Sequence, residues 1–177
     1  MSSGIFALTL ATALGCGIAG GIFFAFSTFV MPALSALPAG QGIAAMQRIN
    51  VKVINAWFMT AFLGTGGLSV AAIVVAGANW GTTYAPYLLA GAVLYLAGVI
   101  GVTMLAHEPR NHALAVAEPT ATAQWRRYVT EWTSWNHVRT LAPLIAAALE
   151  IWSPSCRLST PPVRPNQPLA SASRPTS

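Results

Sequence analysis

Long apolar stretches, separated by short polar segments, fill most of the chain before residue 153. They cover about residues 4–34, 53–78, 84–106 and 141–152. About 20 consecutive apolar residues cross the hydrocarbon core of a bilayer as a helix. Each stretch is predicted to be helical, because backbone groups in lipid must be hydrogen-bonded within their own segment. The pattern therefore predicts an all-α membrane protein, an up-down-up-down bundle of four transmembrane helices.

The fourth stretch is weaker than the other three. It is only twelve residues long, contains Pro143 and is interrupted by Glu150. Either the helix begins near Trp132 and carries polar residues into the bilayer, or it does not cross the bilayer completely. We therefore expect the fourth helix to be short or incomplete.

The composition changes abruptly at Glu150. Residues 153–177 contain six prolines, six serines, three arginines and no acidic residue. Such a composition is typical of disorder, so we expect a four-helix transmembrane domain over residues 1–152 and a disordered tail over residues 153–177. One hypothesis is that an altered reading frame replaced the end of the last helix. Genomic DNA without an apolar continuation in its other frames would contradict that hypothesis.

Two amphipathic segments, residues 41–57 and 122–135, lead into the second and fourth apolar stretches. In the later segment, aromatic and apolar residues recur at spacings of three and four, which places them on one face of a helix. Both segments are predicted to be interfacial helices that lie at the membrane surface. We interpret Trp125, Trp132 and Arg126 there as membrane anchors.

Charged residues are scarce, at 7% of the chain, and the first of them is Arg48. The N-terminus has no basic region and its apolar run is too long for a signal peptide, so we expect a retained span. Basic residues gather in loops 35–52 and 107–135, which predicts a multi-pass protein of the cell membrane with these loops cytoplasmic and the N-terminus outside. The net charge of +5 then contacts anionic lipid headgroups, and we expect no nucleic-acid partner.

Polar residues of the apolar stretches collect at one end of the predicted bundle. In an up-down-up-down arrangement, the end of the first helix, the start of the second, the end of the third and the start of the fourth lie on the same side. Ionisable residues at membrane depth are costly and therefore indicate a functional site, although asparagines there can also simply join helices. The residues at this end are Asn50, Asn55, His107, Glu108, Asn111, Asn136, His137 and Arg139.

A metal site at this end is a weaker interpretation. His107, Glu108 and His112, together with His137, contain suitable ligand types. However, residues 107 and 112 do not have the i, i+4 spacing that places two ligands on one helix face, and Pro109 lies between them. We therefore expect no metal.

Four segments in this order resemble the anthrone oxygenase-like family of small four-helix membrane proteins. They are FFAFSTFVMPAL (23–34), GIAAMQRIN (42–50), VTMLAHEPRNHALA (102–115) and WRRYVTEWTSWNHVRT (125–140), and the resemblance covers roughly residues 5–150. Two departures stand out. The third family motif usually reads Asn-Val-Pro-x-Asn, but here His107 and Glu108 replace its Asn and Val, and the fourth helix is normally longer and apolar to its end.

The resemblance implies oxygenation of an anthrone-like polycyclic phenol or ketone, with molecular oxygen as co-substrate and no metal or flavin. His137 is then the candidate base, and Asn136 and Arg139 are candidates to stabilise the oxyanion. On one helix these three side chains cannot all share a face, so at most two point inward together. Candidate substrate-binding residues are Trp132 and Trp135, which could sandwich the rings, with His107, Asn111 and Asn55.

A different class of function remains open. Small membrane proteins also act as scaffolds or subunits without any catalytic role, and a family resemblance alone does not decide between the two classes. The expected partners in either case are membrane lipids and, for the enzyme, a hydrophobic aromatic small molecule.

Overall fold

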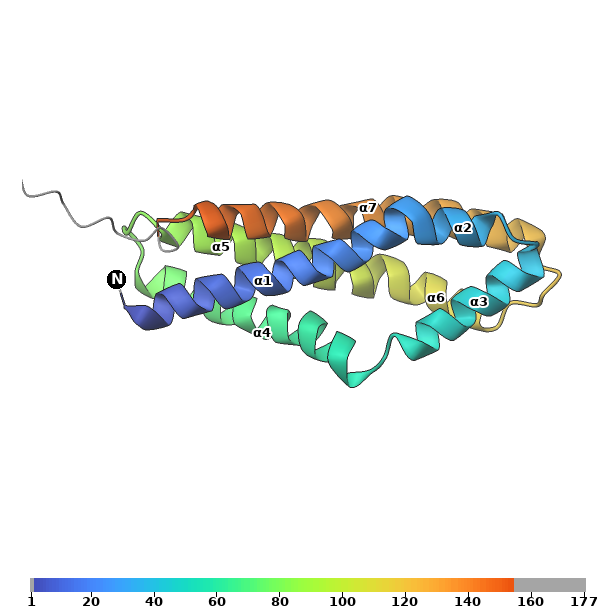
Figure 1. Cartoon of the computed structure of the whole chain (residues 1–177), viewed down its shortest axis with the longest axis horizontal. Coiled ribbons are helices and arrows are strands. Elements are labelled where there is room, and N and C mark those ends of the chain that lie inside the picture. Colours follow the sequence, from blue (N-terminus) through green and yellow to red (C-terminus); the bar gives the residue numbers. More distant parts are fainter. Residues whose placement is uncertain (1, 155–177) are drawn as a thin grey trace, which may run out of the picture.

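Every regular element of the described chain, residues 2–154, is helical in the computed structural model. The elements are α1 (Ser3–Ala25), η1 (Phe26–Val30), α2 (Met31–Ser35), α3 (Ala39–Lys52), α4 (Ala56–Ala78), α5 (Ala85–Tyr95), η2 (Leu96–Gly101), η3 (Thr103–His107), α6 (Glu108–Ala115) and α7 (Thr122–Trp152), where η marks a π-helical segment. They form an elongated bundle (Figure 1). The predicted disorder from residue 155 and the reading-frame hypothesis concern residues outside the described part of the chain.

Consecutive helical elements join into longer segments, here called rods, and three of these rods are long and apolar enough to cross a membrane. They are Ser3–Ser35, Ala56–Ala78 and Ala85–Ala115. Large apolar side chains on their outer surface, such as Leu14 and Leu105, are exposed in the isolated chain, as expected of surface that lipid covers. The prediction of an all-helical protein with membrane-spanning segments is confirmed.

The last rod differs from the expectation. Residues 122–135 and the fourth apolar stretch form one continuous helix, α7, of 31 residues with Pro143 inside it. At 1.5 Å per residue it is about 45 Å long, which exceeds the roughly 30 Å of a hydrocarbon core. Glu150 does not interrupt it: the helix continues to Trp152, and the fully buried Glu150 side chain lies where Gly91 of α5 has no Cβ. The prediction of a separate interfacial helix before a short fourth span is therefore wrong.

Two prolines lie inside the rods without ending them. Pro32 follows η1 and Pro109 follows η3, and in each case the preceding turn is widened: the N–H of Met31 donates to Phe26 O, and that of Glu108 donates to Thr103 O. Proline has no N–H and its ring clashes with the carbonyl four residues earlier, which a wider turn relieves. At Pro32 the rod therefore continues through a π-helical turn.

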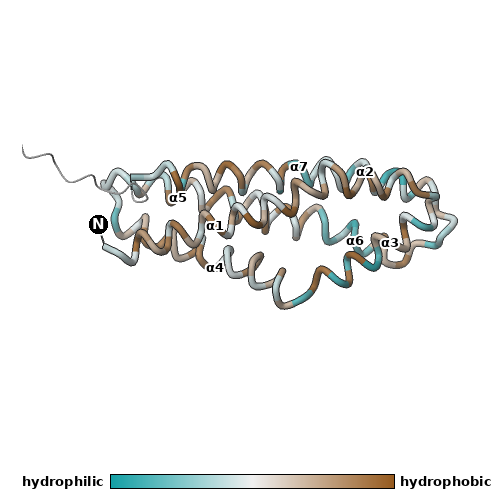
Figure 2. Tube along the Cα trace, viewed as in Figure 1, coloured by the Kyte–Doolittle hydropathy of each residue, from teal (hydrophilic) through white to brown (hydrophobic). Residues whose placement is uncertain are grey.

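The rods pack in a ring of neighbours, with α1 against α4 and α7, and α5 against the same two helices. One core cluster fills the apolar half of this ring and includes Cys16, Phe62 and Tyr95. A second cluster joins α2, α3, α6 and the first half of α7, and contains Met31, Ile43, Met46, Leu114, Trp125, Tyr128 and Trp132. Polar residues are frequent along α3 and α6 (Figure 2), so the bundle continues beyond its most apolar part as a packed extension.

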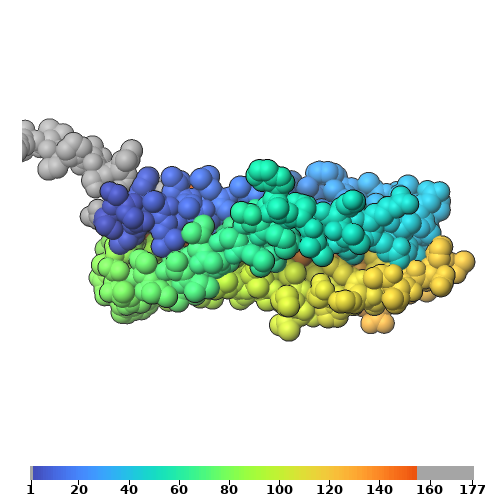
Figure 3. All heavy atoms as spheres, turned by 90° about the horizontal axis from the view of Figure 1, so that it is seen from below, coloured from blue at the N-terminus to red at the C-terminus, as the bar shows by residue number. Residues whose placement is uncertain are grey.

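The link between α3 and α4 interrupts one rod beside this extension. The helix ends at Lys52, and Asn55 restarts it as the N-cap of α4, because its Oδ1 accepts the N–H of Phe58 at 3.1 Å. Figure 3 shows α3 and α4 on the surface next to the η3–α6 rod, with a seam between them. The interruption of the rod therefore lies beside this seam.

Close helix contacts give a stability prediction. A Cβ added at Gly15 of α1 would overlap the Thr65 hydroxyl of α4, whereas one added at Gly17 would meet nothing within 4 Å. We expect Gly17→Ala to be neutral or stabilising by up to about 1 kcal/mol through helix propensity. Gly15→Ala should destabilise by about 1–3 kcal/mol through overpacking. Thermal unfolding in detergent measures both, and equal midpoints would contradict this packing.

Candidate functional site

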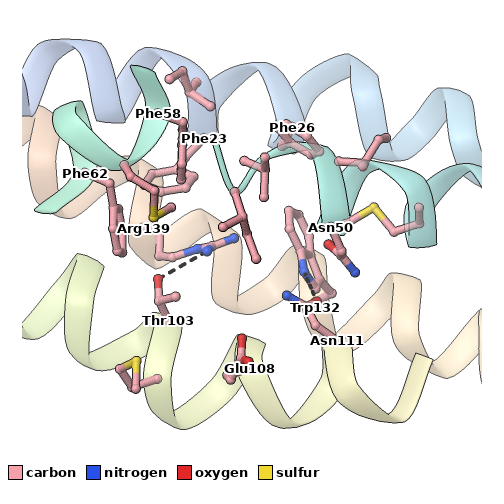
Figure 4. A pocket seen from close by; sticks show the side chains of 17 residues that line it. Phe23, Phe26, Asn50, Phe58, Phe62, Thr103, Glu108, Asn111, Trp132 and Arg139 are labelled. Carbon is pink, nitrogen blue, oxygen red and sulfur yellow. Dashed lines mark hydrogen bonds between the residues drawn. The ribbon is translucent and has the colours of Figure 1, made fainter. Parts of the chain in front are cut away.

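A cavity of about 360 Å³ lies where the apolar half of the bundle meets the extension (Figure 4). Its walls come from α1, η1, α3, the α3–α4 link, α4, η3, α6 and α7. The lining residues are Ile22, Phe23, Phe26, Met46, Ile49, Asn50, Val53, Ile54, Phe58, Met59, Phe62, Thr103, Met104, Glu108, Asn111, Trp132 and Arg139. Ligand cavities are typically apolar with a few convergent polar groups, and this one has that character.

Aromatic side chains form much of the wall, together with methionine and branched aliphatic side chains. Phe23, Phe26 and Trp132 come from neighbouring rods, and the Phe26 and Trp132 ring centroids lie 5.6 Å apart. Phe58 and Phe62 stack on each other on α4. Aromatic faces pack well on flat rings, so these walls favour a flat, apolar ligand.

Arg139 brings a positive charge to the wall of this cavity. Its side chain is buried, its Nη1 donates to Thr103 Oγ1 at 3.3 Å, and its Nη2 donates to Asn136 Oδ1 at 2.8 Å. The guanidinium carbon lies 4.4 Å from the Phe23 ring centroid and 5.1 Å from that of Trp132. None of the ion pairs found in the described part of the chain involves Arg139. A buried cation without a carboxylate favours an anionic or strongly polarised oxygen as its ligand.

Asn136 fixes the guanidinium in place. Its Nδ2 donates to Phe23 O and to Ser27 Oγ, both at 2.8 Å, while its Oδ1 accepts from Arg139. The side chain is completely buried. Because both ends of one amide are used, Asn136 joins α7 to α1 and η1 and also orients Arg139 toward the cavity.

Trp132 is held by an asparagine in the same way. Asn111 Oδ1 accepts from Trp132 Nε1 at 3.2 Å and from the Tyr128 hydroxyl at 2.8 Å. His107 packs behind the indole with its ring centroid 4.9 Å away, edge to face, and does not line the cavity. Trp125 and Trp132 are both buried, so their interpretation as surface anchors was wrong.

The sequence-predicted residues separate into two groups. Asn136 and Arg139 come together, and Trp132 and Asn111 join Arg139 in the cavity wall. The remaining candidates lie elsewhere: His137 and Trp135 are exposed on the outer surface, and Asn55 is exposed as the cap of α4. The expectation that His137 occupies the inner face of its helix was wrong, and the limit of two inward side chains among residues 136, 137 and 139 is confirmed.

Glu108 was expected at the polar end of the bundle but was not among the predicted catalytic or substrate-binding residues. It lines the cavity from the first turn of α6, and its Oε1 lies 3.1 Å from Nε2 of His112. The available signal was a departure from the family pattern, because a carboxylate stands where an apolar residue is usual. Asn50, which was also expected at this end without an assigned role, lines the cavity, as does Thr103, which was not predicted.

An ion-pair network braces the outer side of the extension. Glu131 of α7 accepts from Arg127 at 2.7 Å and from Arg110 of α6 at 2.9 Å. The Arg127 hydrogen bond, reinforced by Arg110, holds the pKa of the Glu131 carboxyl below its ordinary value. In the described residues no group of three or more His, Cys, Asp or Glu side chains is placed to hold a metal ion.

The two neighbouring residues of α7 give a matched stability prediction. Asn136→Ala should destabilise the protein by about 1–3 kcal/mol, because it removes the buried amide that bonds the Phe23 carbonyl, the Ser27 hydroxyl and Nη2 of Arg139. His137→Ala, on the exposed face, should change stability by less than about 0.5 kcal/mol. Unfolding of the purified variants in mixed micelles compares them, and a greater loss for His137→Ala would contradict the orientation of α7.

Comparison with known proteins identifies the family of this chain. The family model described as anthrone oxygenase matches residues 54–149, which is more than half of the chain. The match runs from the α3–α4 link through most of α7 and includes Thr103, Trp132 and Arg139. No curated protein and no solved structure matches the chain. The chain belongs to the anthrone oxygenase family.

Proposed function

We propose that this protein is a membrane oxygenase that converts an anthrone-like polycyclic phenolic ketone to a quinone. The observation that carries the proposal is the buried Arg139, which has no carboxylate partner and lies between two aromatic rings at the wall of an apolar cavity. Family membership supports the same activity. Molecular oxygen is the co-substrate, and the proposal includes no metal or flavin.

The overall reaction balances without another oxidant. An anthrone has a carbonyl on one edge of its central ring and a methylene on the opposite edge. Loss of a methylene proton leaves an electron-rich aromatic oxyanion, which can transfer an electron to oxygen. Recombination forms a carbon–oxygen bond at the former methylene carbon, and loss of water from this hydroperoxide gives the quinone. One oxygen atom enters the product, and the other leaves as water with the two methylene hydrogens.

The cavity residues have separate roles in this proposal. Arg139 and the Thr103 hydroxyl hold the carbonyl oxygen and stabilise the charge that develops on it. Phe23 and Trp132 contact the faces of the rings. Asn136 acts as a positioning residue, because its contacts are with Arg139 and the backbone of α1. We assign no step to His137, since it points away from the cavity.

The proposal includes an arrangement in the membrane. All four rods form an up-down-up-down transmembrane bundle, with the N-terminus outside and loops 35–52 and 107–135 on the cytoplasmic side. The exposed apolar side chains of Val51, Ile54 and Trp57, at the α3–α4 link, then contact lipid beside the cavity. A greasy, flat substrate dissolved in the bilayer can reach the cavity by this route.

Oxygen uptake and quinone absorbance test the proposed activity. Membranes with the wild-type protein should oxidise a hydroxylated anthrone faster than membranes without it, whereas Arg139→Met should lose about a hundredfold in rate, the effect of removing one oxyanion donor. Because anthrones oxidise spontaneously, His137→Ala is the matched control and should keep the wild-type rate. Equal rates for wild type, Arg139→Met and empty membranes, with both proteins folded, would contradict the enzyme and favour a scaffold or subunit.

A further inference from the structure

The proposed oxidation begins with removal of a methylene proton, and the wall of the cavity offers a specific group for it. Among the described residues that line the cavity, Glu108 is the only one with a carboxylate or imidazole side chain. We propose that Glu108 is the general base for this proton and that His112 passes the proton on to solvent. This inference rests on the proposed oxygenase function.

The positions of the two charged side chains fit the substrate. Glu108 projects from α6 and Arg139 from α7, and in Figure 4 they lie on different sides of the space that separates the rods. No ion pair joins them in the described chain. The carbonyl and the methylene of an anthrone are on opposite edges of one ring, so a carbonyl held at Arg139 leaves the methylene directed away from the guanidinium. A base on another helix suits this arrangement.

His112 gives the proton a way out of the cavity. Its Nε2 lies 3.1 Å from Glu108 Oε1, one turn further along α6, and its side chain is 78% exposed. The methylene C–H bond breaks, its electron pair stays on the rings and the carbonyl oxygen, and the proton moves to Glu108. Glu108 then transfers it to Nε2 of His112, and His112 releases a proton to water, which restores the carboxylate.

Neither other histidine fits this role. His107 is buried behind Trp132 and does not line the cavity, and His137 is exposed on the opposite side of α7 from Arg139. Asn50 and Asn111 line the cavity, but an amide does not act as a base at neutral pH. Glu108, which stands where the family motif usually has Val, thus acts as the base in this proposal.

Anaerobic deuterium exchange isolates the proton step from the oxygen step. The wild-type protein in D₂O without oxygen should accelerate exchange of the methylene hydrogens of 1,8-dihydroxyanthrone, read by mass spectrometry. Glu108→Gln should lower the protein-dependent exchange about a hundredfold, the scale of general-base catalysis. Glu118→Gln, a matched charge change at an exposed residue outside the cavity, should leave it unchanged.

Chemical rescue separates a base from a structural role. Added formate should restore exchange to Glu108→Ala, because it supplies a carboxylate in the vacated space, and it should not affect Glu118→Ala. Wild-type exchange in Glu108→Gln, or a loss in Glu108→Ala that formate does not restore, overturns the assignment of the base. Oxygen-dependent turnover that persists in those variants would leave the oxygenase function intact, whereas no turnover by the wild type overturns both.

Discussion

The structure depends on one buried amide, that of Asn136, which lies between α7 and α1. A cation inside a membrane bundle is costly unless polar groups surround it. The Asn136 side-chain oxygen accepts a hydrogen bond from Arg139, while its nitrogen donates to the Phe23 carbonyl and the Ser27 hydroxyl. The same contact therefore joins two helices and points a guanidinium into the cavity. Stability and the proposed chemistry converge on this side chain, so a change there is expected to affect both.

The cavity itself follows from irregularities in otherwise continuous rods. Pro32 and Pro109 each follow a π-helical turn, and these turns lie at the level where Phe26 and Thr103 line the cavity. On the remaining side, the chain leaves the helix between Lys52 and Ala56. Where regular helices would pack closely, these features leave a space at the end of the apolar region. A ligand there would lie between the apolar half of the bundle and the extension.

The sequence was informative about the helices and less so about their faces. Apolar length predicted the membrane-spanning rods, because lipid demands internally bonded backbone. The sequence pattern predicted that Trp125 and Trp132 lie on the surface. Neighbouring residues in the sequence do not indicate that α2, α3 and α6 pack over these two side chains. Residues 132, 136 and 139 follow the helical spacing of three and four, and residue 137 does not, so this signal for Arg139 over His137 was present. The sequence placed Glu108 at the same end as Arg139, but only the tertiary structure shows that its side chain lines the cavity.

The central claim is that Arg139 binds the oxyanion of a flat aromatic ligand, and the ionisation of a bound dye tests it directly. A hydroxyanthraquinone changes its visible spectrum when its phenol ionises, so the pH midpoint of the bound dye reports the charge beside it. The account predicts a lower midpoint for the dye on the wild-type protein than for the dye on Arg139→Met, with binding retained by the aromatic walls. Identical midpoints for the two proteins, with the dye bound to both, would contradict it.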